Sequence, residues 1–204
     1  MLVIGRAAVE AFWVFAYIFR APTAEKRIYR YTAWQLAGFL ERQKHTAQDP
    51  AHRQKQDAEA TTISELRSKL HQMPEFLALS QGDQRQVDRG KWTHPLLWKG
   101  IATAAGFSEG YYERIYSYLC SYAHSSYLSI LQMDQARTLA DQRMLGGTIL
   151  QICTYTMARF VTEYLALFPE AEAARSANPA LARLARTWEF DRSLLDAAFP
   201  RKDR

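Results

Sequence analysis

The stretch from Glu109 to Ile130 constrains the fold of this chain more than any other part. It contains six of the eleven tyrosines, and neither Gly nor Pro occurs between Tyr111 and Met133. The sequence therefore allows one long helix here. After Tyr111, the only formal charges are those of Glu113 and Arg114, near the start of this helix. A helix without a strongly charged side is typically surrounded by other helices. We predict that it is the central helix of a bundle.

A polar stripe runs along this predicted helix around its single histidine. At about 100° per residue, the face centred on His124 also contains small and polar residues. They include Glu113, Ser117, Cys120 and Ser121, with Tyr116 and Tyr127 at the edges. An unperturbed imidazole titrates at about pH 6.5, which suits acid–base chemistry. A histidine in a helix is more often a structural hydrogen-bonding group, so both interpretations stand.

The composition is that of an ordinary globular protein built from helices. Of the 204 residues, 48% are hydrophobic and 23% are charged, which suits a chain with one buried core. No long stretch alternates as strands do, and neither Asn-Gly nor Asp-Gly occurs. We predict an all-α fold in which residues 1–204 form a single domain, a helical bundle with a protruding helical hairpin.

Helix-breaking residues divide this bundle. The first helix is predicted over Leu2–Phe19, before Pro22, and Thr23 is a good N-cap for the second, which should end near His45. Residues 46–60 are polar and contain a proline, so they are predicted to form a mobile hairpin tip before the helix resumes at Thr61.

The C-terminal part should contain further helices. The pair Gly146-Gly147 predicts a break before a very apolar helix over Thr148–Phe168. The tail, about residues 170–204, is predicted to form one or two shorter amphipathic helices.

The cysteines and the apolar helices indicate a cytoplasmic protein. Cys120 and Cys153 lie in apolar stretches outside any CxxC pair, as buried thiols do in a reducing compartment. The two most apolar helices each contain an Arg and a Glu, which would be costly inside a bilayer. We therefore expect no membrane association.

Those charges form two pairs at i, i+4 spacing, Arg6 with Glu10 and Arg159 with Glu163. Each pair is either an ion pair at the surface, with a small contribution to stability, or a buried pair held by further hydrogen bonds. Two aromatic residues share the face of Arg6 and Glu10, which tilts the first pair towards burial. For the second pair, the interpretation as an ion pair with only a structural role is favoured.

A basic and aromatic segment is the candidate contact for nucleic acid. Lys26, Arg27 and Arg30 alternate with tyrosines, and such side chains can contact phosphates and stack on bases. The formal net charge of +5 lies in the first half of the chain, which permits an acidic partner such as RNA. A solvated helix face is the commoner explanation. We find no DNA-binding motif.

No metal or cofactor site is predicted. The sequence contains neither HExxH nor paired Glu-x-x-His motifs. Trp92 and Trp98, in a proline-containing segment, either line a small pocket or hold the segment against the core.

The ordered set of these motifs resembles a known family. Across Leu2–Met133 the chain resembles a bacterial family of unknown function, numbered 5677. The residues that carry the resemblance are Arg6, Glu10, Tyr17, Trp98, Tyr112, Tyr116, Leu119, Ser121 and His124. More distantly, it resembles the HEPN class of helical bundles, many of which are RNases with an Arg-x4–6-His motif. This chain departs from that motif, because Arg114 lies ten positions before His124.

Two functions follow from these residues. The first is a binding or regulatory domain, compatible with a homodimer, in which Arg6, Glu10 and His124 form a buried polar network. The second is a metal-independent, HEPN-like RNase, or a toxin or phage-defence effector, with His124 as general acid and base, Arg6 stabilising charge and Glu10 orienting one of them. The candidate ligand-binding residues are Tyr17, Trp98, Tyr116 and Ser121.

Overall fold

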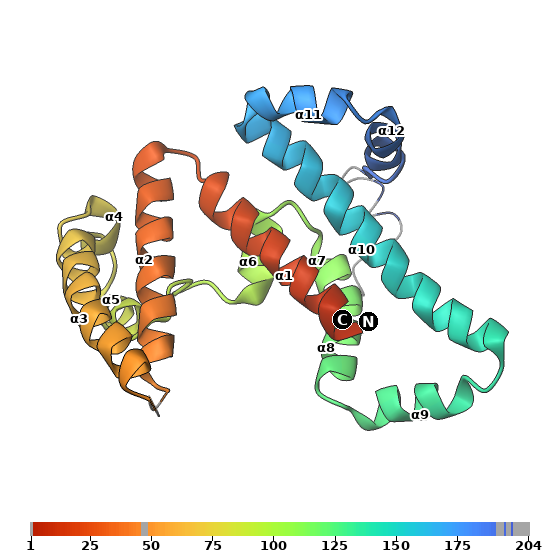
Figure 1. Ribbon diagram of the computed structural model, residues 1–204, viewed down its shortest axis with the longest axis horizontal. Coiled ribbons are helices and arrows are strands. Elements are labelled where there is room, and N and C mark those ends of the chain that lie inside the picture. The colour runs from red at the N-terminus through yellow and green to blue at the C-terminus, as the bar shows by residue number, and fades with distance from the viewer. Residues whose placement is uncertain (1, 46–48, 191–193, 195–196, 198–204) are drawn as a thin grey trace. The chain divides into compact units, whose positions relative to one another are not determined.

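The computed structural model describes residues 2–45, 49–190, 194 and 197 (Figure 1). These residues form helices and loops and contain no strand, which confirms the all-α prediction. The chain divides into two compact units. Unit 1 consists of Met1–Ala16 and Ala102–Arg204, and unit 2 is Tyr17–Ile101. The prediction of a single domain stays a prediction.

Helix lengths vary from one turn to eight turns. In chain order the elements are α1 (Leu2–Phe19), α2 (Ala24–Gln43), α3 (Pro50–His71), α4 (Pro74–Leu77), α5 (Gln81–Asp88), α6 (Trp98–Ala104), α7 (Glu109–Tyr111), a π-helical turn (Tyr112–Tyr116), α8 (Ser117–Ala123), α9 (Tyr127–Gln135), α10 (Leu139–Leu167), a 3-10 turn (Pro169–Ala171), α11 (Glu172–Ser176) and α12 (Pro179–Thr187).

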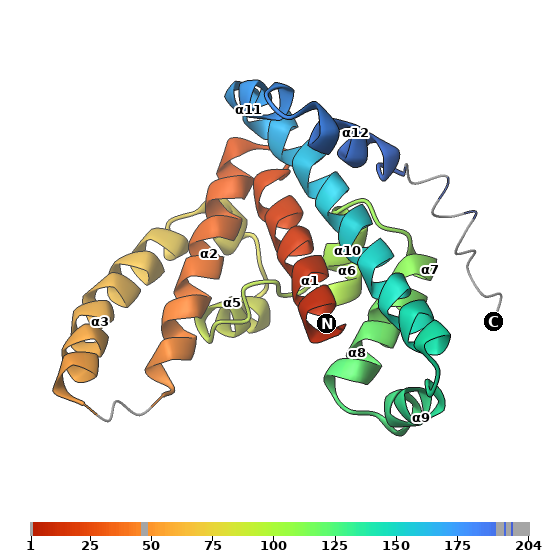
Figure 2. The same ribbon diagram turned by 45° about the vertical axis from the view of Figure 1, so that its right-hand side comes forward.

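Unit 2 is organised around the helical hairpin of α2 and α3, which lie side by side in both ribbon views (Figures 1 and 2). Thr23 caps α2 by accepting a hydrogen bond from the Lys26 amide. The inner faces of the hairpin pack on α4 and α5 around one core. The buried members of that core are Tyr29, Ala33, Leu36, Ile63, Leu70, Phe76 and Val87.

The second helix of the hairpin begins earlier than expected. α3 starts at Pro50 rather than near Thr61, because Asp49 caps it by accepting from the His52 amide and proline suits the first turn. Of the predicted mobile tip at 46–60, residues 46–48 lie outside the described part and residues 50–60 are helical.

Aromatic rings fill the core of unit 1. The ring of Phe107 lies 5.7 Å, centroid to centroid, from those of Phe12 and Trp13 in α1, and 5.8 Å from that of Tyr155 in α10. At Gly5 a Cβ atom would lie 3.2 Å from Ile149 Cγ2. The absence of a side chain there allows α1 to pack closely against α10.

The tyrosine-rich stretch is not one continuous helix. It continues from α7 through the π turn into α8, and it ends at His124. Ser125 adopts a left-handed backbone with φ 50°. The amides of Ser125 and Ser126 bond back to the carbonyls of Tyr122 and Ser121, which is the Schellman pattern of a helix end. Ser126 then caps α9.

The prediction of a helix break at Gly146-Gly147 is wrong. α10 runs through both glycines, and its start is fixed upstream by a capping box of Thr138 and Asp141. A glycine in a helix costs only about 1 kcal/mol relative to alanine, which a helix of 29 residues can tolerate. As predicted, the described part of the tail forms two short helices, α11 and α12.

Among the described helices, none combines the length and the apolarity needed to cross a bilayer. Cys120 and Cys153 are partly buried free thiols, and burial raises the pKa of the Cys153 thiol.

Candidate functional site

The site in unit 1 starts from the pair that α1 presents at i, i+4 spacing. The Arg6 guanidinium donates from Nε to Glu10 Oε1 over 2.7 Å, and the two side chains are 23% and 24% exposed. This hydrogen bond raises the pKa of Arg6 further. The pair is thus neither fully buried nor a freely solvated surface pair.

Tyr116 holds this pair from the inner side. Its phenol hydroxyl donates to the same Glu10 Oε1 over 2.6 Å, and its buried ring lies 4.9 Å from that of Trp13. Burial, followed by the hydrogen bond to the carboxylate, raises the pKa of Tyr116 above the usual range. The phenol therefore stays protonated and acts as a donor.

The π turn determines where Tyr116 lies. Tyr116 is the last residue of the five-residue π turn, Tyr112–Tyr116. Such a turn inserts one extra residue into a helix and is frequent at functional sites. The rings of Tyr112 and Tyr116 stack at 5.1 Å, which places Tyr112 beside Tyr116.

His124 forms the outer end of the network. Its Nε2 lies 2.8 Å from Arg6 Nη1, although the two residues are 118 positions apart in sequence. A guanidinium can only donate, so Nε2 accepts and the neutral ring carries its proton on Nδ1. His124 is exposed, because α8 ends at this residue.

Together the four residues form one chain of hydrogen bonds that runs from the core to solvent. Tyr116 and Arg6 both donate to Glu10, and Arg6 also donates to His124. Arg6 Nη2 makes no hydrogen bond with any described residue, so the guanidinium keeps donor capacity for a bound anion. An anion that displaces His124 from Nη1 would also release the Nε2 lone pair to accept a proton.

The other predicted ligand-binding residues are placed differently. Tyr17 and Trp98 belong to unit 2, whereas the network lies in unit 1. Ser121 donates its hydroxyl to the Ser117 carbonyl one turn earlier, over 3.0 Å. Tyr116 was predicted from the sequence as a ligand-binding residue, but nothing in the sequence indicated that its hydroxyl bonds to Glu10.

The predicted nucleic-acid residues lie at the start of α2. Arg30 donates to the Tyr17 carbonyl and its guanidinium lies 3.8 Å from the centroid of the Tyr17 ring. Lys26 and Arg27 are exposed.

The second Arg–Glu pair is more buried than the first. Arg159 and Glu163 are only 12% and 15% exposed, with 3.4 Å between Nη2 and Oε1. Arg159 also donates to the Tyr155 hydroxyl and to the Ala105 carbonyl, and it lies over the Phe107 ring. It therefore ties α10 to the segment after α6, which is a structural role.

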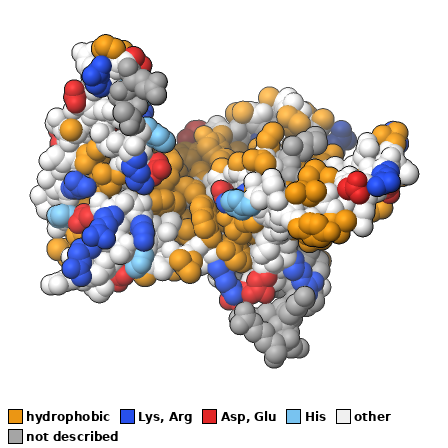
Figure 3. All heavy atoms as spheres, turned by 90° about the horizontal axis from the view of Figure 1, so that it is seen from below, with side chains coloured by type: hydrophobic (Ala, Val, Ile, Leu, Met, Phe, Trp, Pro, Cys, Tyr) orange, Lys and Arg blue, Asp and Glu red, His pale blue; other side chains and the backbone are white. Residues whose placement is uncertain are grey.

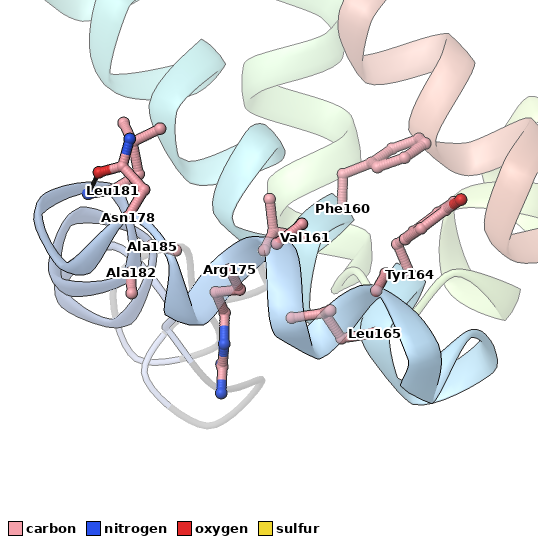
Figure 4. A pocket seen from close by; sticks show the side chains of 11 residues that line it. Phe160, Val161, Tyr164, Leu165, Arg175, Asn178, Leu181, Ala182 and Ala185 are labelled. Atoms are coloured by element: carbon pink, nitrogen blue, oxygen red, sulfur yellow. Dashed lines mark hydrogen bonds between the residues drawn. The ribbon is translucent and has the colours of Figure 1, made fainter.

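An apolar pocket of about 400 Å³ lies elsewhere in unit 1, between α10 and α12 (Figure 4). Its walls include Phe160, Val161, Tyr164, Leu165, Leu181 and Ala182. Two of its other members, Arg175 and Asn178, are already engaged, because Arg175 donates to Glu172 and Asn178 caps α12. None of the four network residues lines it. Periodicity in the sequence gave no sign of this pocket.

No cluster of three or more His, Cys, Asp or Glu side chains among the described residues is arranged to hold a metal ion. Comparison with family models matches residues 1–137 to a family of unknown function, DUF5677. This segment contains all four residues of the network. Comparison with curated proteins and with solved structures gave no match.

Proposed function

The chain belongs to the DUF5677 family, and because the function of that family is unknown, we propose a role from the geometry of unit 1 alone. We propose that it is a binding domain in which Arg6, Glu10, Tyr116 and His124 recognise an anionic group. The observation that carries this proposal is the 2.8 Å contact between Arg6 Nη1 and the exposed His124 ring.

A purely structural network would not need this arrangement. A polar network that only fixes the register of helices is expected to be buried and satisfied on all sides. Here the exposure rises from the buried Tyr116 to the exposed His124. Glu10 and Tyr116 hold Arg6 from inside, which reduces the entropy that the guanidinium loses when it binds a ligand.

Binding can be tested with inorganic phosphate and then with adenosine 5′-monophosphate. The imidazole resonances of His124 are followed by NMR at pH 7.5 in the wild type, Arg6→Lys and His124→Ala, with Arg137→Ala as a control on an exposed pair. We expect saturable shifts in the wild type and in the control, weaker binding in Arg6→Lys, and no imidazole signal from His124→Ala. If the wild-type His124 resonances stay unshifted up to millimolar phosphate and nucleotide, the proposal is wrong.

The exposed imidazole beside a guanidinium also favours a second candidate, metal-independent cleavage of RNA. The phosphate would bind Arg6 and release His124 Nε2. His124 would then take the proton of the ribose 2′-hydroxyl as its oxygen attacks phosphorus. The bond from phosphorus to the 5′-oxygen breaks, and that oxygen takes a proton from water. The hydroxide that remains is neutralised by the proton on His124, and the other product is a 2′,3′-cyclic phosphate. Arg6 would stabilise the charge that develops on the phosphate oxygens.

The test is cleavage of an end-labelled RNA in the presence of EDTA. We expect His124→Ala to abolish cleavage with a melting temperature close to that of the wild type, because His124 is exposed. Arg6→Ala should also lose activity. Absence of cleavage by the wild type over a range of RNA sequences would remove this candidate and leave the binding proposal standing. The resemblance to HEPN proteins stays a prediction.

A further inference from the structure

The outer face of α2, in unit 2, has a composition that the network in unit 1 does not explain. Arg27, Tyr31, Trp34, Gly38 and Arg42 occur at spacings of four, three, four and four, which places them in one row along the helix. All five are exposed. The opposite face of α2 supplies core residues to the hairpin, so this row is not needed to hold unit 2 together.

The middle of the row is a shallow hollow of about 360 Å³. It is lined by Trp34, Gln35, Gly38, Phe39 and Arg42. A Cβ atom at Gly38 would meet nothing within 4 Å, so the space beside the Trp34 ring is open. Trp34 is 41% exposed, and the ring of Tyr31 lies 5.9 Å from it. The planes of the two rings are tilted by 38°, and both rings lie next to the hollow.

Positive charge lies at both ends of this row. Arg27 is exposed, and its side chain forms no hydrogen bond or ion pair with the residues that the structure describes. Arg42 is paired with Glu59 at 2.6 Å, but its side chain is 52% exposed. Glu41, at the edge of the row, is paired with Lys44. One end of the row is therefore fully available to an anion, and the other end is partly neutralised.

The unit as a whole is basic. Residues 17–101 contain 14 Lys and Arg and 9 Asp and Glu, which accounts for all of the formal charge of +5. Several Lys and Arg side chains are visible over the helices of unit 2 in the left part of Figure 3. Such a surface attracts polyanions.

Proteins that bind single-stranded nucleic acid commonly do so with exposed aromatic rings that lie between basic side chains. Bases stack on aromatic side chains without regard to sequence, and basic residues contact the backbone phosphates. Consecutive single-stranded phosphates lie within reach of a row that spans about four helical turns. A double helix offers no unstacked base to the Trp34 ring.

We propose that the outer face of α2 binds single-stranded nucleic acid, with a base stacked on Trp34 in the hollow beside Gly38 and a phosphate bound by Arg27. Tyr31 extends the stacking surface, and Arg42 lies at the far end of the strand. The proposal does not depend on the chemistry of His124, because all of its residues belong to unit 2.

The experiment measures the fluorescence anisotropy of labelled 12-nucleotide oligouridylate and oligothymidylate, and of a DNA duplex, with the whole chain. Trp34→Ala should weaken binding of the single strand by about 5- to 150-fold, since stacking contributes about 1–3 kcal/mol per base. Trp34→Phe should restore most of it. Arg27→Gln should lower the slope of log Kd against log salt concentration by about 0.7. Binding of either single strand, or of both, supports the proposal. The ratio of the two affinities identifies the sugar that is preferred.

Two exposed positions provide matched controls. Arg53→Gln on α3 removes a cation from the other helix of the hairpin, and Tyr127→Ala removes an aromatic ring that is 80% exposed on α9. Neither should change the affinity by more than about twofold. The proposal is overturned if Trp34→Ala binds as tightly as the wild type while circular dichroism shows both to be folded. It is also overturned if the duplex binds as well as the single strands. The titration of the His124 resonances with inorganic phosphate reports on the network alone, so a failure there can be distinguished from a failure of this proposal.

Discussion

The hydrogen bond between Tyr116 and Glu10 can be measured by a double-mutant cycle. The variants are Tyr116→Phe, Glu10→Ala and the double variant. Tyr116→Phe removes only the hydroxyl that donates to Glu10 Oε1 over 2.6 Å. Glu10→Ala removes the acceptor of this bond and of the bond from Arg6.

The expected magnitudes follow from burial. Tyr116 is only 6% exposed, so a phenol without its acceptor should cost about 1–3 kcal/mol. Glu10 is 24% exposed, and water can partly replace it. We therefore expect about 2 kcal/mol of destabilisation for Glu10→Ala and about 1 kcal/mol for Tyr116→Phe. The double variant should be little worse than Glu10→Ala, because it no longer contains a phenol that has lost its Glu10 acceptor. The coupling is then about 1 kcal/mol.

The assay is urea unfolding at pH 7, followed by far-UV circular dichroism and by tryptophan fluorescence. The pair of Asp134 and Arg137 is the control, because its side chains are 66% and 77% exposed. Its coupling should stay below about 0.5 kcal/mol. If the effects of Glu10→Ala and Tyr116→Phe add within about 0.3 kcal/mol, the two groups do not interact, and the inner half of the network is refuted.

Three further variants test other parts of the structure. Ser125→Gly should stabilise the chain by about 0.5 kcal/mol in urea unfolding, because relief of the left-handed strain exceeds the added entropy of the unfolded glycine; Ser125→Val should destabilise it. Arg159→Met should cost about 3 kcal/mol, since it leaves the Glu163 carboxylate without this cation in a largely buried position; a cost below about 1 kcal/mol would contradict the buried pair. Burial raises the pKa of Tyr29 to about 12, so the folded chain keeps a proton that the unfolded chain releases from pH 10 upwards. The free energy of unfolding should not be lowered by Tyr29 below pH 10, and it should fall between pH 10 and 12 by an amount on the order of 2 kcal/mol. Tyr29→Phe should lessen this fall and should cost little at pH 7.

The sequence predicted those features that depend on local chemistry. The bounds of α1, the cap at Thr23 and the two helices of the described tail follow from residues that favour or break helices. The i, i+4 spacing likewise predicted that Arg6 and Glu10 would share a face. Each of these features depends on contacts within a few residues.

Features that depend on contacts between residues far apart in the sequence could not be predicted from it. Nothing in the composition of the two helices indicates that Arg6 would reach His124, or that Glu10 would accept from Tyr116. The sequence could propose that these residues belong together, but only the packing of α1 against α8 gives the distances. The same limit applies at Gly146, where a local preference for a break is overcome by the remaining turns of α10.

The two Arg–Glu pairs show why the same spacing can lead to different roles. Arg6 and Glu10 lie where α8 ends, so one side of the pair opens to solvent through His124. Arg159 instead contacts a backbone carbonyl and an aromatic ring, and these groups shield it from solvent. A pattern of charges along one helix therefore cannot distinguish a site from a structural tie.

The end of α8 at His124 is the local feature on which the outer half of the network depends. A continuous helix through Ser125 would place another turn over this position and would surround the ring with further side chains. The Schellman bonds from Ser125 and Ser126 end the helix without a glycine, at the cost of one strained residue. A strained residue persists only where the surrounding structure requires it. In this chain, the cap of α9 at Ser126 and the contact of His124 with Arg6 supply that requirement.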